Sequence, residues 1–283
     1  MKILVVGSNG FMGSNLVRFL KQNGHCVETS SSCNQGGINP DTGMFPESFF
    51  VTEGTGCVVY LAQSPIVGQR QRISAHQLAV NVVSAVHCAT KAIEARAKRF
   101  IYVSTGSVYA PTFLPLGENS PTARDNGYAL SKLHGEEALS LLAYEIDLIC
   151  VRPFGVYGPG QSGRLIPNLT TSISNGRPVM LNPKSGEDGT CEGLRLSLCH
   201  VDDASQALVH LAVHGGPGIL NLAGDEAPSI RMIAEEIGRK LEIEPIYEIA
   251  DRARTFDFVA DVSLLRQTFD HQFLSFREGV STL

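Results

Sequence analysis

The sequence predicts an α/β fold, a doubly wound parallel sheet with helices on both faces. Short apolar runs with the composition of buried strands alternate with longer helical stretches, and strands separated by helices form parallel sheets through right-handed crossovers. The first strand is also followed by three closely spaced glycines and an amphipathic helix. Such a strand-turn-helix unit is typical of the start of a nucleotide-binding sheet.

The N-terminal segment predicts a dinucleotide-binding turn. An apolar strand at residues 3–6 leads into Gly7-x2-Gly10-x2-Gly13, and a helix follows. Gly7 permits the tight turn, Gly10 lets the backbone approach a pyrophosphate, and Gly13 lets the helix pack closely on the strand. The helix dipole favours phosphate at this end of the helix. A turn that serves packing alone explains this context less well. The expected cofactor contacts are Gly7, Asn9, Gly10, Phe11, Met12 and Gly13.

The later elements follow in alternation. We expect strands at residues 27–30, 57–62, 99–104 and 147–152, and helices at 75–97, 128–144 and 204–214. Residues 33–56 are rich in Gly, Pro, Ser and Asn. Because this segment is short for a full strand-helix unit, we interpret it as a loop-dominated connection.

Tyr128 and Lys132 form a candidate proton-transfer pair. They stand four residues apart in a predicted helix, downstream of the hydroxyl-rich segment 102–107, and residues i and i+4 share one face of a helix. A free tyrosine has a pKa of about 10 and is a poor acid or base at neutral pH. A nearby fixed cation favours the phenolate and lowers that pKa. The spacing alone is common in helices, and it gains weight from the segments that precede it.

Composition argues against several classes of function. The 283 residues carry 23 basic and 28 acidic side chains, a net charge of -5, without long runs, so we expect no nucleic-acid partner. The seven cysteines are scattered, which favours buried reduced thiols in a reducing compartment. No apolar stretch approaches the ~20 residues of a membrane span, and the N-terminal apolar run is too short for a signal peptide. We therefore expect a cytoplasmic protein with no membrane partner.

Further short motifs follow the glycine turn nearly from end to end of the chain. They are strand 58–62, Asn81-Val82, residues 102–105 leading to Val108-Tyr109, Tyr128 with Lys132, and the segments 151–160, 164–167, 200–203, 221–224 and 261–279. In this order and spacing the chain resembles the extended short-chain dehydrogenase/reductases, in the branch that contains nucleotide-sugar epimerases, dehydratases and reductases. The resemblance implies an NAD- or NADP-dependent enzyme that acts on a nucleotide-activated sugar.

The resemblance also implies a domain organisation. A Rossmann-type dinucleotide-binding domain would span residues 1–153, with residues 196–215 returning to it. Residues 154–283 would form mainly a smaller C-terminal lobe that binds the substrate. The helices at 75–97 and 128–144 often pair across a two-fold axis in similar proteins, so we expect a homodimer.

The resemblance assigns roles to individual residues. Thr105 would hydrogen-bond the substrate oxygen that becomes a carbonyl, and Tyr128 would exchange the proton of that oxygen as general acid and base. Lys132 would hold the nicotinamide ribose and lower the pKa of Tyr128. Further cofactor contacts would come from Ser31, Ser32, Leu61, Ala62, Gln63, Asn81, Ser104 and Pro153, besides Tyr128 and Lys132 themselves. Substrate contacts would come from Ser107, Arg164, Asn168 and Arg195.

Two of these assignments have alternatives. The Thr105 hydroxyl could cap its own backbone at the end of the strand, and Ser104 or Ser107 could share or take its role. Arg195 falls one position from the arginine usual in the family, and a solvated side chain is an equal alternative there.

The segment around residue 200 has a structural interpretation. For His200 we favour structural hydrogen bonding over a metal site or a catalytic triad, and we predict no metal. Asp202 or Asp203 is expected to be the N-cap of the helix at 204–214 rather than a catalytic acid.

The end of the second strand departs from the family pattern. NAD enzymes usually place an acidic residue there to bind the ribose 2′-OH, whereas this chain has Ser31 followed by Ser32. Neutral hydroxyls do not repel a 2′-phosphate, so we favour NADP over NAD. No arginine follows directly to clamp that phosphate.

The residues after Thr105 bear on the reaction. Sugar 4,6-dehydratases that resemble this chain carry Asp-Glu there, and those carboxyls eliminate water. Gly106 and Ser107 occupy the positions here, so we favour an epimerase or a reductase over a dehydratase. The alternatives are a reductase of a small carbonyl metabolite and a non-catalytic member of the family that binds the cofactor.

Overall fold

A computed structural model of the protein describes residues 1–33, 36–64, 70–186 and 191–283. By its contacts the chain divides into two compact units. Unit 1 comprises Met1–Val108, Pro121–Pro153 and Ser205–Leu220, and unit 2 comprises Tyr109–Ser120, Phe154–Ala204 and Asn221–Leu283. Across the described ranges, no helix combines the length and the apolar composition that a membrane span requires.

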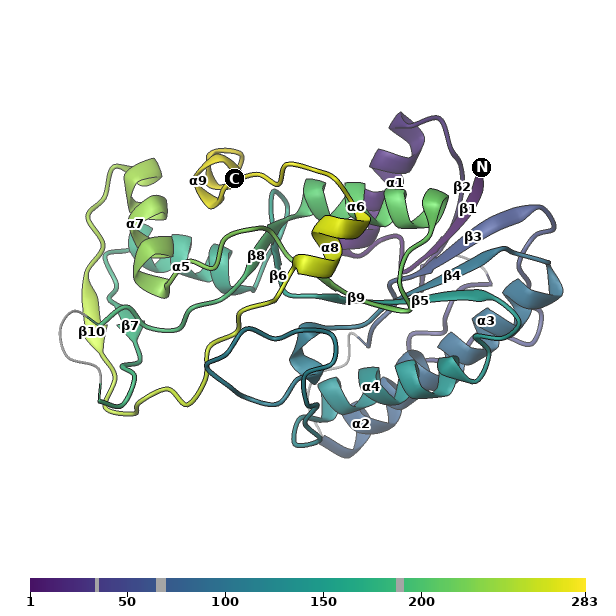
Figure 1. The fold of residues 1–283 in the computed structure, drawn as a ribbon, viewed down its shortest axis with the longest axis horizontal. Helices are drawn as coiled ribbons and strands as arrows, with labels where there is room; N and C mark the ends of the chain where they lie inside the picture. Colours follow the sequence, from purple (N-terminus) through teal and green to yellow (C-terminus); the bar gives the residue numbers. More distant parts are fainter. Residues whose placement is uncertain (34–35, 65–69, 187–190) are drawn as a thin grey trace. The chain divides into compact units, whose positions relative to one another are not determined.

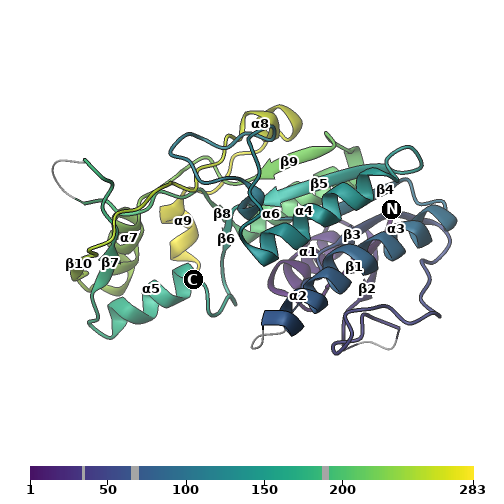
Figure 2. The ribbon, with the colours of Figure 1, turned by 90° about the horizontal axis from the view of Figure 1, so that it is seen from below.

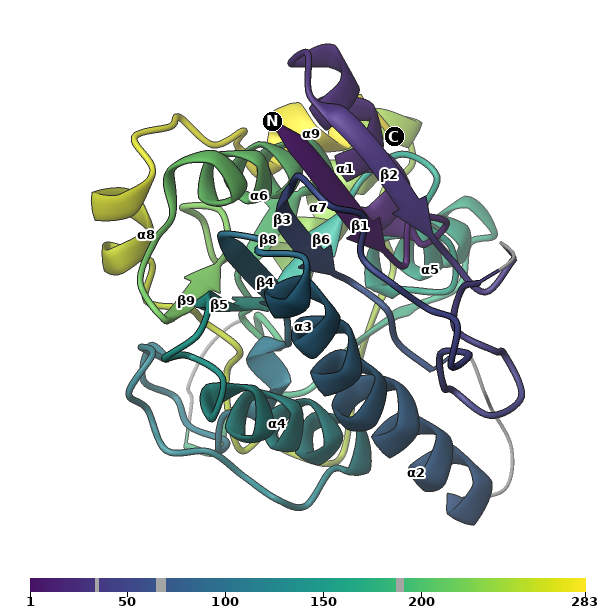
Figure 3. The same ribbon diagram turned by 90° about the vertical axis from the view of Figure 1, so that its right-hand side faces the viewer.

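The described residues of unit 1 are organised around a six-stranded sheet. Its strands are β1 (Lys2–Val6), β2 (Cys26–Ser30), β3 (Thr55–Tyr60), β4 (Arg99–Val103), β5 (Asp147–Pro153) and β9 (Ile219–Leu222), in the order β2-β1-β3-β4-β5-β9 (Figure 3). The strands from β2 to β5 pair in parallel. β4 is buried along its whole length, as expected where helices cover both faces of a parallel sheet. The predicted α/β fold is confirmed.

Helices cover both faces of this sheet (Figure 1). α1 (Phe11–Gln22) and α6 (Val201–His214) lie on one face, and α3 (Ala85–Glu94) and α4 (Gly127–Ser140) lie on the other. Figure 2 views unit 1 from the side of α3 and α4. Three buried alanines of α3, at positions 85, 89 and 92, pack in one core cluster with the aromatic side chains of β3 and β4. Their small size lets the helix lie close to these large rings.

A π-helical turn interrupts the helix that was predicted at 75–97. The helical run begins with α2 (Arg70–Leu78), passes through η1 (Ala79–Ser84) and ends with α3. π turns are rare and frequently mark functional sites. The buried Tyr60 hydroxyl donates to Val80 O at 2.6 Å, and the buried Tyr102 hydroxyl donates to Asn81 O at 2.8 Å. Two strands of the sheet therefore hold this turn in place.

The connection between β2 and β3 contains no helix or strand in its described residues, 31–33 and 36–54, as predicted. β2 consequently forms one edge of the sheet. The loop still contributes to the core of unit 1, because Ile38, Phe45, Phe49 and Val51 are buried in it. The rings of Phe45 and Phe49 stack with their centroids 3.8 Å apart.

Unit 2 contains short parallel strand pairs with helices beside them. β6 (Gly155–Tyr157) pairs with β8 (Leu198–His200), and β7 (Val179–Leu181) pairs with β10 (Tyr247–Ile249). The helices of this unit are α5 (Leu165–Ser174), α7 (Ile230–Leu241), α8 (Ser263–Thr268) and α9 (Phe276–Ser281). α5 and α9 pack against α7, and buried apolar side chains from these elements form a second core cluster.

Candidate active site

The glycine turn follows β1 as predicted, and two of its glycines are required for packing. Gly7 has a φ of +85°, which side chains with a Cβ rarely adopt, and a Cβ there would lie 2.7 Å from Ala62 N. A Cβ on Gly13 would lie 2.2 Å from Gly7 O. Close packing of β1, β3 and α1 therefore excludes any larger residue at these positions.

The third glycine of the turn, Gly10, borders open space. A Cβ there would meet only Gly7 O, at 3.3 Å, and both Asn9 and Gly10 are exposed. Gly10 is the N-cap of α1, and the first turn of this helix carries no acidic residue. The N–H groups of Phe11, Met12 and Gly13 begin the helix, where intrahelical acceptors are lacking. This helix end fits the diphosphate of a dinucleotide.

The glycine turn lies where the strand order of the sheet reverses. From β1 the chain continues to β2 on one side and returns to β3 on the other, and ligands bind outside the carboxyl ends of strands at such a point. Leu61, Ala62 and Gln63 follow β3 at this edge, where Leu61 N donates to Val6 O at 2.8 Å. Pro153 is the last residue of β5, and its parallel pairing brings it to the same edge.

Tyr128 is the second residue of α4 and reaches the residues after β3. The helix is capped by Asn126, whose Oδ1 accepts from Tyr128 N at 3.0 Å and from Ala129 N at 3.2 Å. The half-buried Tyr128 side chain donates its hydroxyl proton to Gln63 Oε1 at 3.4 Å. The phenol therefore lies at the carboxyl edge of the sheet.

Lys132, one helical turn further along α4, reaches the same edge from inside the protein. Its side chain is 2% exposed, and Nζ donates to Val103 O at 2.9 Å and to Ala62 O at 3.3 Å. The ammonium also lies 4.9 Å from the centroid of the Tyr102 ring. Burial lowers the pKa of Lys132 to about 7, against the opposing effect of the Glu136 carboxylate. Tyr128 and Lys132 thus contact two consecutive residues, Gln63 and Ala62, at one edge of the sheet.

Thr105 follows β4 at this edge and makes a local hydrogen bond. Its Oγ1 accepts from Ser107 N at 3.1 Å, in the short 3₁₀ turn η2 (Gly106–Val108). A hydroxyl that accepts one hydrogen bond still has a proton to donate. The capping bond therefore leaves Thr105 able to donate to a substrate oxygen, as predicted from the resemblance. The Ser104 hydroxyl donates instead to Glu136 Oε1.

Asn81 links the π turn to the helix that carries Tyr128. Its Nδ2 donates to Ser131 Oγ at 2.9 Å, and Ser131 Oγ donates to Tyr128 O at 2.8 Å. Asn81 Oδ1 is buried without a hydrogen-bond partner among the described residues. The side chain therefore braces the first turn of α4 and keeps an unused acceptor.

The end of β2 carries unused hydroxyls. Ser30 Oγ and Ser31 Oγ are buried and have no hydrogen-bond partner within the described parts of the chain. Ser32 lines a cavity of about 380 Å³ together with Ile38, Asn39, Met44 and Phe45 of the following loop. Buried hydroxyls are normally paired, so this end of the sheet has capacity to bind a polar ligand.

The predicted substrate residues of unit 2 lie on two elements. Arg164 precedes α5, and Asn168 N donates to Arg164 O at 2.9 Å in the first turn of that helix. Both side chains are exposed, and so is that of Arg195. Arg195 forms an isolated bridge with Ser229, and its N–H donates to Asp257 Oδ1 at 3.0 Å. Ser107 belongs to unit 1.

The helix predicted at 204–214 begins earlier, and its aspartates do not cap it. α6 starts at Val201, so Asp202 and Asp203 lie inside its first turn. The ring of His200 takes the capping position, because its Nδ1 accepts from Asp202 N at 3.3 Å. His200 Nε2 lies 3.1 Å from Thr282 Oγ1. The expected N-cap role of Asp202 or Asp203 is wrong, and structural hydrogen bonding by His200 is confirmed.

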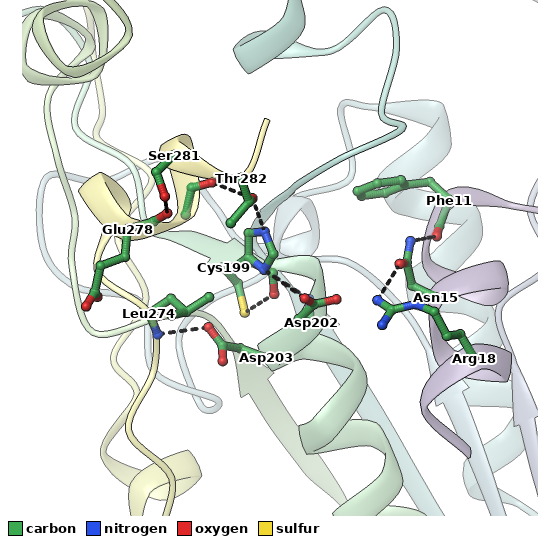
Figure 4. A network of polar contacts seen from close by, with 12 residues as sticks. Phe11, Asn15, Arg18, Cys199, Asp202, Asp203, Leu274, Glu278, Ser281 and Thr282 are labelled. Atoms are coloured by element: carbon green, nitrogen blue, oxygen red, sulfur yellow. Dashed lines mark hydrogen bonds and ion pairs between the residues drawn. The ribbon is translucent and has the colours of Figure 1, made fainter. Parts of the chain in front are cut away.

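Asp203 instead binds the C-terminal segment of unit 2 (Figure 4). Its Oδ1 lies 2.8 Å from His271 Nε2. Its Oδ2 accepts from Leu274 N at 2.9 Å, the contact drawn in the figure. In unit 1, the same figure shows Asn15 of α1 donating to Phe11 O at 2.9 Å and accepting from Arg18 at 3.1 Å. The two contacts of Asp203, with His271 and with Leu274, are structural.

Sequence reasoning missed a buried ion pair beside the site. Arg152 of β5 donates through Nη2 to Glu136 Oε2 of α4 at 2.5 Å, and the two side chains are 4% and 6% exposed. Two signals pointed to it. Arg152 interrupts an apolar strand, and Glu136 follows Lys132 by four residues on the same helix face.

The chain is similar to a known protein family and to characterised relatives. The model of the NAD dependent epimerase/dehydratase family matches residues 3–223. A UDP-glucose 4-epimerase of Halalkalibacterium halodurans is 27% identical over 285 residues, which cover 89% of this chain and 84% of the relative. A dTDP-D-glucose 4,6-dehydratase of Bos taurus is 26% identical over 262 residues, which cover 83% of this chain and 72% of the relative.

Solved structures share the fold. MoeE5 in complex with UDP-glucuronic acid and NAD aligns with a TM-score of 0.78 at 24% identity, over 100% of this chain and 97% of that one. The UDP-glucose 4-epimerase of Thermus thermophilus in complex with NAD aligns with a TM-score of 0.76 at 21% identity, over the same shares. Both structures hold NAD, and the comparisons give no support to the preference for NADP that Ser31 and Ser32 suggested.

Proposed function

Because this chain belongs to the NAD-dependent epimerase/dehydratase family, we propose that it is an NAD-dependent enzyme that epimerises or reduces a nucleotide-activated sugar. One observation carries the proposal. The Tyr128 hydroxyl and the Lys132 ammonium reach adjacent residues, Gln63 and Ala62, at the carboxyl edge of the sheet. The glycine turn that fits a diphosphate packs against Ala62 at that same edge.

Each side chain of the site would have a distinct task. Tyr128 would take the proton of a substrate hydroxyl as it becomes a carbonyl and return it in the reverse step. Thr105 would donate its hydroxyl proton to the same oxygen. Lys132 has three N–H donors, of which two bind Ala62 O and Val103 O. The third is available for a ribose hydroxyl, and the positive charge favours the phenolate of Tyr128.

The residues at the β1 and β2 ends would hold the cofactor. The first turn of α1 would bind the diphosphate through its N–H groups, and the unused Ser31 hydroxyl, with Ser32 beside it, would face the adenosine half. When bound, NAD supplies the hydride acceptor and donor. We propose NAD because it is the dinucleotide in the similar solved structures.

Epimerisation or reduction suits this chain better than 4,6-dehydration. Elimination of water needs an acid and a base beside the sugar. After Thr105 the chain has Gly106 and Ser107, which offer no carboxyl group. The relatives include epimerases, a dTDP-4-dehydro-6-deoxy-D-allose reductase and dehydratases, so the residues at these two positions are the basis for this choice.

In unit 2, we propose that Arg164, Asn168 and Arg195 bind the phosphates or nucleotide of the substrate. Two of the three carry a positive charge, and all three side chains are exposed, which suits contact with an anionic ligand. We also propose a homodimer through the α2–α3 run and α4, where Leu78 of α2 and Val83 of η1 are exposed apolar side chains. Sedimentation of the purified protein tests the dimer.

The decisive test is Tyr128→Phe, with Tyr144→Phe as the matched control because Tyr144 is 99% exposed. Turnover of UDP- or dTDP-linked hexoses should fall by about 10²–10⁴-fold in the first variant, the usual contribution of general acid–base catalysis. NAD binding, measured by calorimetry, should be largely intact in Tyr128→Phe and unchanged in Tyr144→Phe. A Tyr128→Phe variant that retains full turnover contradicts the proposal.

Mass spectrometry of the purified protein separates the two reactions. Epimerisation recycles its cofactor, so it should be accompanied by NAD retained through purification. Net reduction consumes a reduced cofactor and should be accompanied by an exchangeable one. Incubation with each sugar then identifies the product.

A further inference from the structure

The buried ion pair of Glu136 and Arg152 takes no part in the proton transfer proposed above. Arg152 donates through Nε to both carboxylate oxygens, at 3.1 Å and 3.2 Å, and through Nη2 to Oε2 at 2.5 Å. The Ser104 hydroxyl also donates to Glu136 Oε1. One carboxylate of α4 is therefore bound from β5 and from the residue that follows β4.

The position of Glu136 on its helix connects it to the candidate active site. Tyr128, Lys132 and Glu136 succeed each other at intervals of four residues, so they lie along one face of α4. Ser104, which Glu136 binds, immediately precedes Thr105. The carboxylate is thus in contact with the segment that carries Thr105, and it lies one helical turn from Lys132.

Within the described part of the chain, Glu136 is the charged group that acts on Lys132. Lys132 also lies over the ring of Tyr102 from β4. The titratable side chains that act on Tyr102 or share the influence of Glu136 include Tyr128 of α4 and Cys150 and Arg152 of β5. Burial raises the pKa of Tyr102 and of Cys150 far above neutrality, so both are uncharged. η1 carries no titratable residue. On the other helices packed against α4, His76 binds Ser64 and Pro40 O, and His87 lies against the rings of Phe45 and Phe49.

We propose that Glu136 is a positioning residue of this site, whose carboxylate keeps the buried Lys132 charged and holds the Thr105 segment against α4. Arg152 holds that carboxylate in place through three hydrogen bonds. A purely structural ion pair is the alternative, and replacing such a pair by apolar residues often leaves stability unchanged or improved. The effect on turnover rests on the proposed function, but the effect on Lys132 is measurable without a substrate.

Three variants separate the two roles. Glu136→Gln removes the negative charge and keeps a side-chain oxygen that can accept a hydrogen bond from Arg152. The double variant Glu136→Leu with Arg152→Met removes the whole pair and fills its volume with apolar groups. Glu137→Gln is the control, because Glu137 is the neighbouring residue and its side chain is 55% exposed. For each protein we would measure the thermal midpoint, the NMR titration of the Lys132 side chain with bound NAD absent, and kcat and KM for the nucleotide sugar from pH 6 to pH 9.

Removal of the charge should make Lys132 easier to deprotonate. In Glu136→Gln the pKa of Lys132 should fall by about one pH unit, which lowers its charged fraction about tenfold once the pH exceeds that pKa. Turnover should therefore fall about tenfold at pH 8 and less at pH 6, with little change in KM. The double variant should recover the thermal midpoint but neither the titration nor kcat, and Glu137→Gln should match the wild type.

Two results would overturn the proposal. One is an unchanged Lys132 titration in both Glu136 variants, and the other is a double variant that recovers kcat along with its thermal midpoint. If Glu136→Gln does not fold, the double variant still decides. If the wild type turns over no nucleotide sugar, the proposed function fails, while the Lys132 titration still decides the role of Glu136.

Discussion

The two ends of the candidate cofactor site in unit 1 are built differently. At the ends of β3 and β4, Lys132, Ser104 and Glu136 are buried, and each is hydrogen-bonded inside the protein. At the end of β2, the buried hydroxyls of Ser30 and Ser31 have no partner among the described residues. Unpaired buried groups cost free energy until a ligand satisfies them. The comparison indicates that the polar side chains of the catalytic end are hydrogen-bonded before a ligand binds. Those of the adenosine end would gain their hydrogen bonds from the ligand.

Lys132→Met should break the catalytic end. The change retains side-chain length and removes the charge one helical turn from Tyr128, so turnover of a nucleotide sugar should fall by roughly 10²–10⁴-fold, as for loss of general acid–base function. Lys91→Met is the control, because Lys91 lies on α3 with a partly exposed side chain paired to Glu94. Steady-state kinetics measure the effect, and a loss of less than about tenfold would contradict an essential charge at position 132.

The same substitution should change how stability depends on pH. The pKa of Lys132 is lowered from 10.5 to about 7 in the folded protein, so between these values the unfolded chain binds more protons and the free energy of unfolding rises with pH. The wild type should gain on the order of 1.4 kcal/mol per pH unit relative to Lys132→Met over this window. Urea unfolding at pH 7, 8 and 9 measures the difference. Parallel stability curves would argue against a buried, destabilised ammonium.

Ser31→Asp should sharpen the contrast at the adenosine end. A carboxylate there would accept hydrogen bonds from the ribose 2′-OH and repel a 2′-phosphate. The ratio of NAD affinity to NADP affinity should rise about tenfold or more, equivalent to about 1.4 kcal/mol or more, with little effect on turnover at saturating NAD. Ser31→Ala is the control for loss of the hydroxyl alone. Calorimetry with both dinucleotides measures the ratio, and an unchanged ratio would place the ribose elsewhere.

The sequence predicted the parts of unit 1 that local pattern determines. The glycine turn, the parallel strands and the loop between β2 and β3 could be read from apolar runs and from Gly and Pro content. The adjacency of Tyr128 and Lys132 followed from helical spacing. These features depend on residues that are close together in the sequence, so they can be predicted from it.

Other features depend on contacts between distant residues. The π turn at Ala79–Ser84 is held by Tyr60 and Tyr102 from two strands, and no local sequence pattern predicts it. Glu136 binds Arg152 and Ser104, which come from separate elements. The first turn of α6 was misassigned because a histidine ring took the capping position in place of an aspartate.

The loop that replaces a strand-helix unit after β2 has a consequence for solubility. It leaves β2 with a partner on one side only, and an unpaired strand edge is a template on which other chains can add and aggregate. β2 is only five residues long, and it carries Glu28 in an ion pair with Lys2 at 2.9 Å. Short length and charge are the usual protections of such an edge. Neutralising Glu28 would remove one of these protections. We therefore expect such a variant to aggregate more than the wild type at high protein concentration.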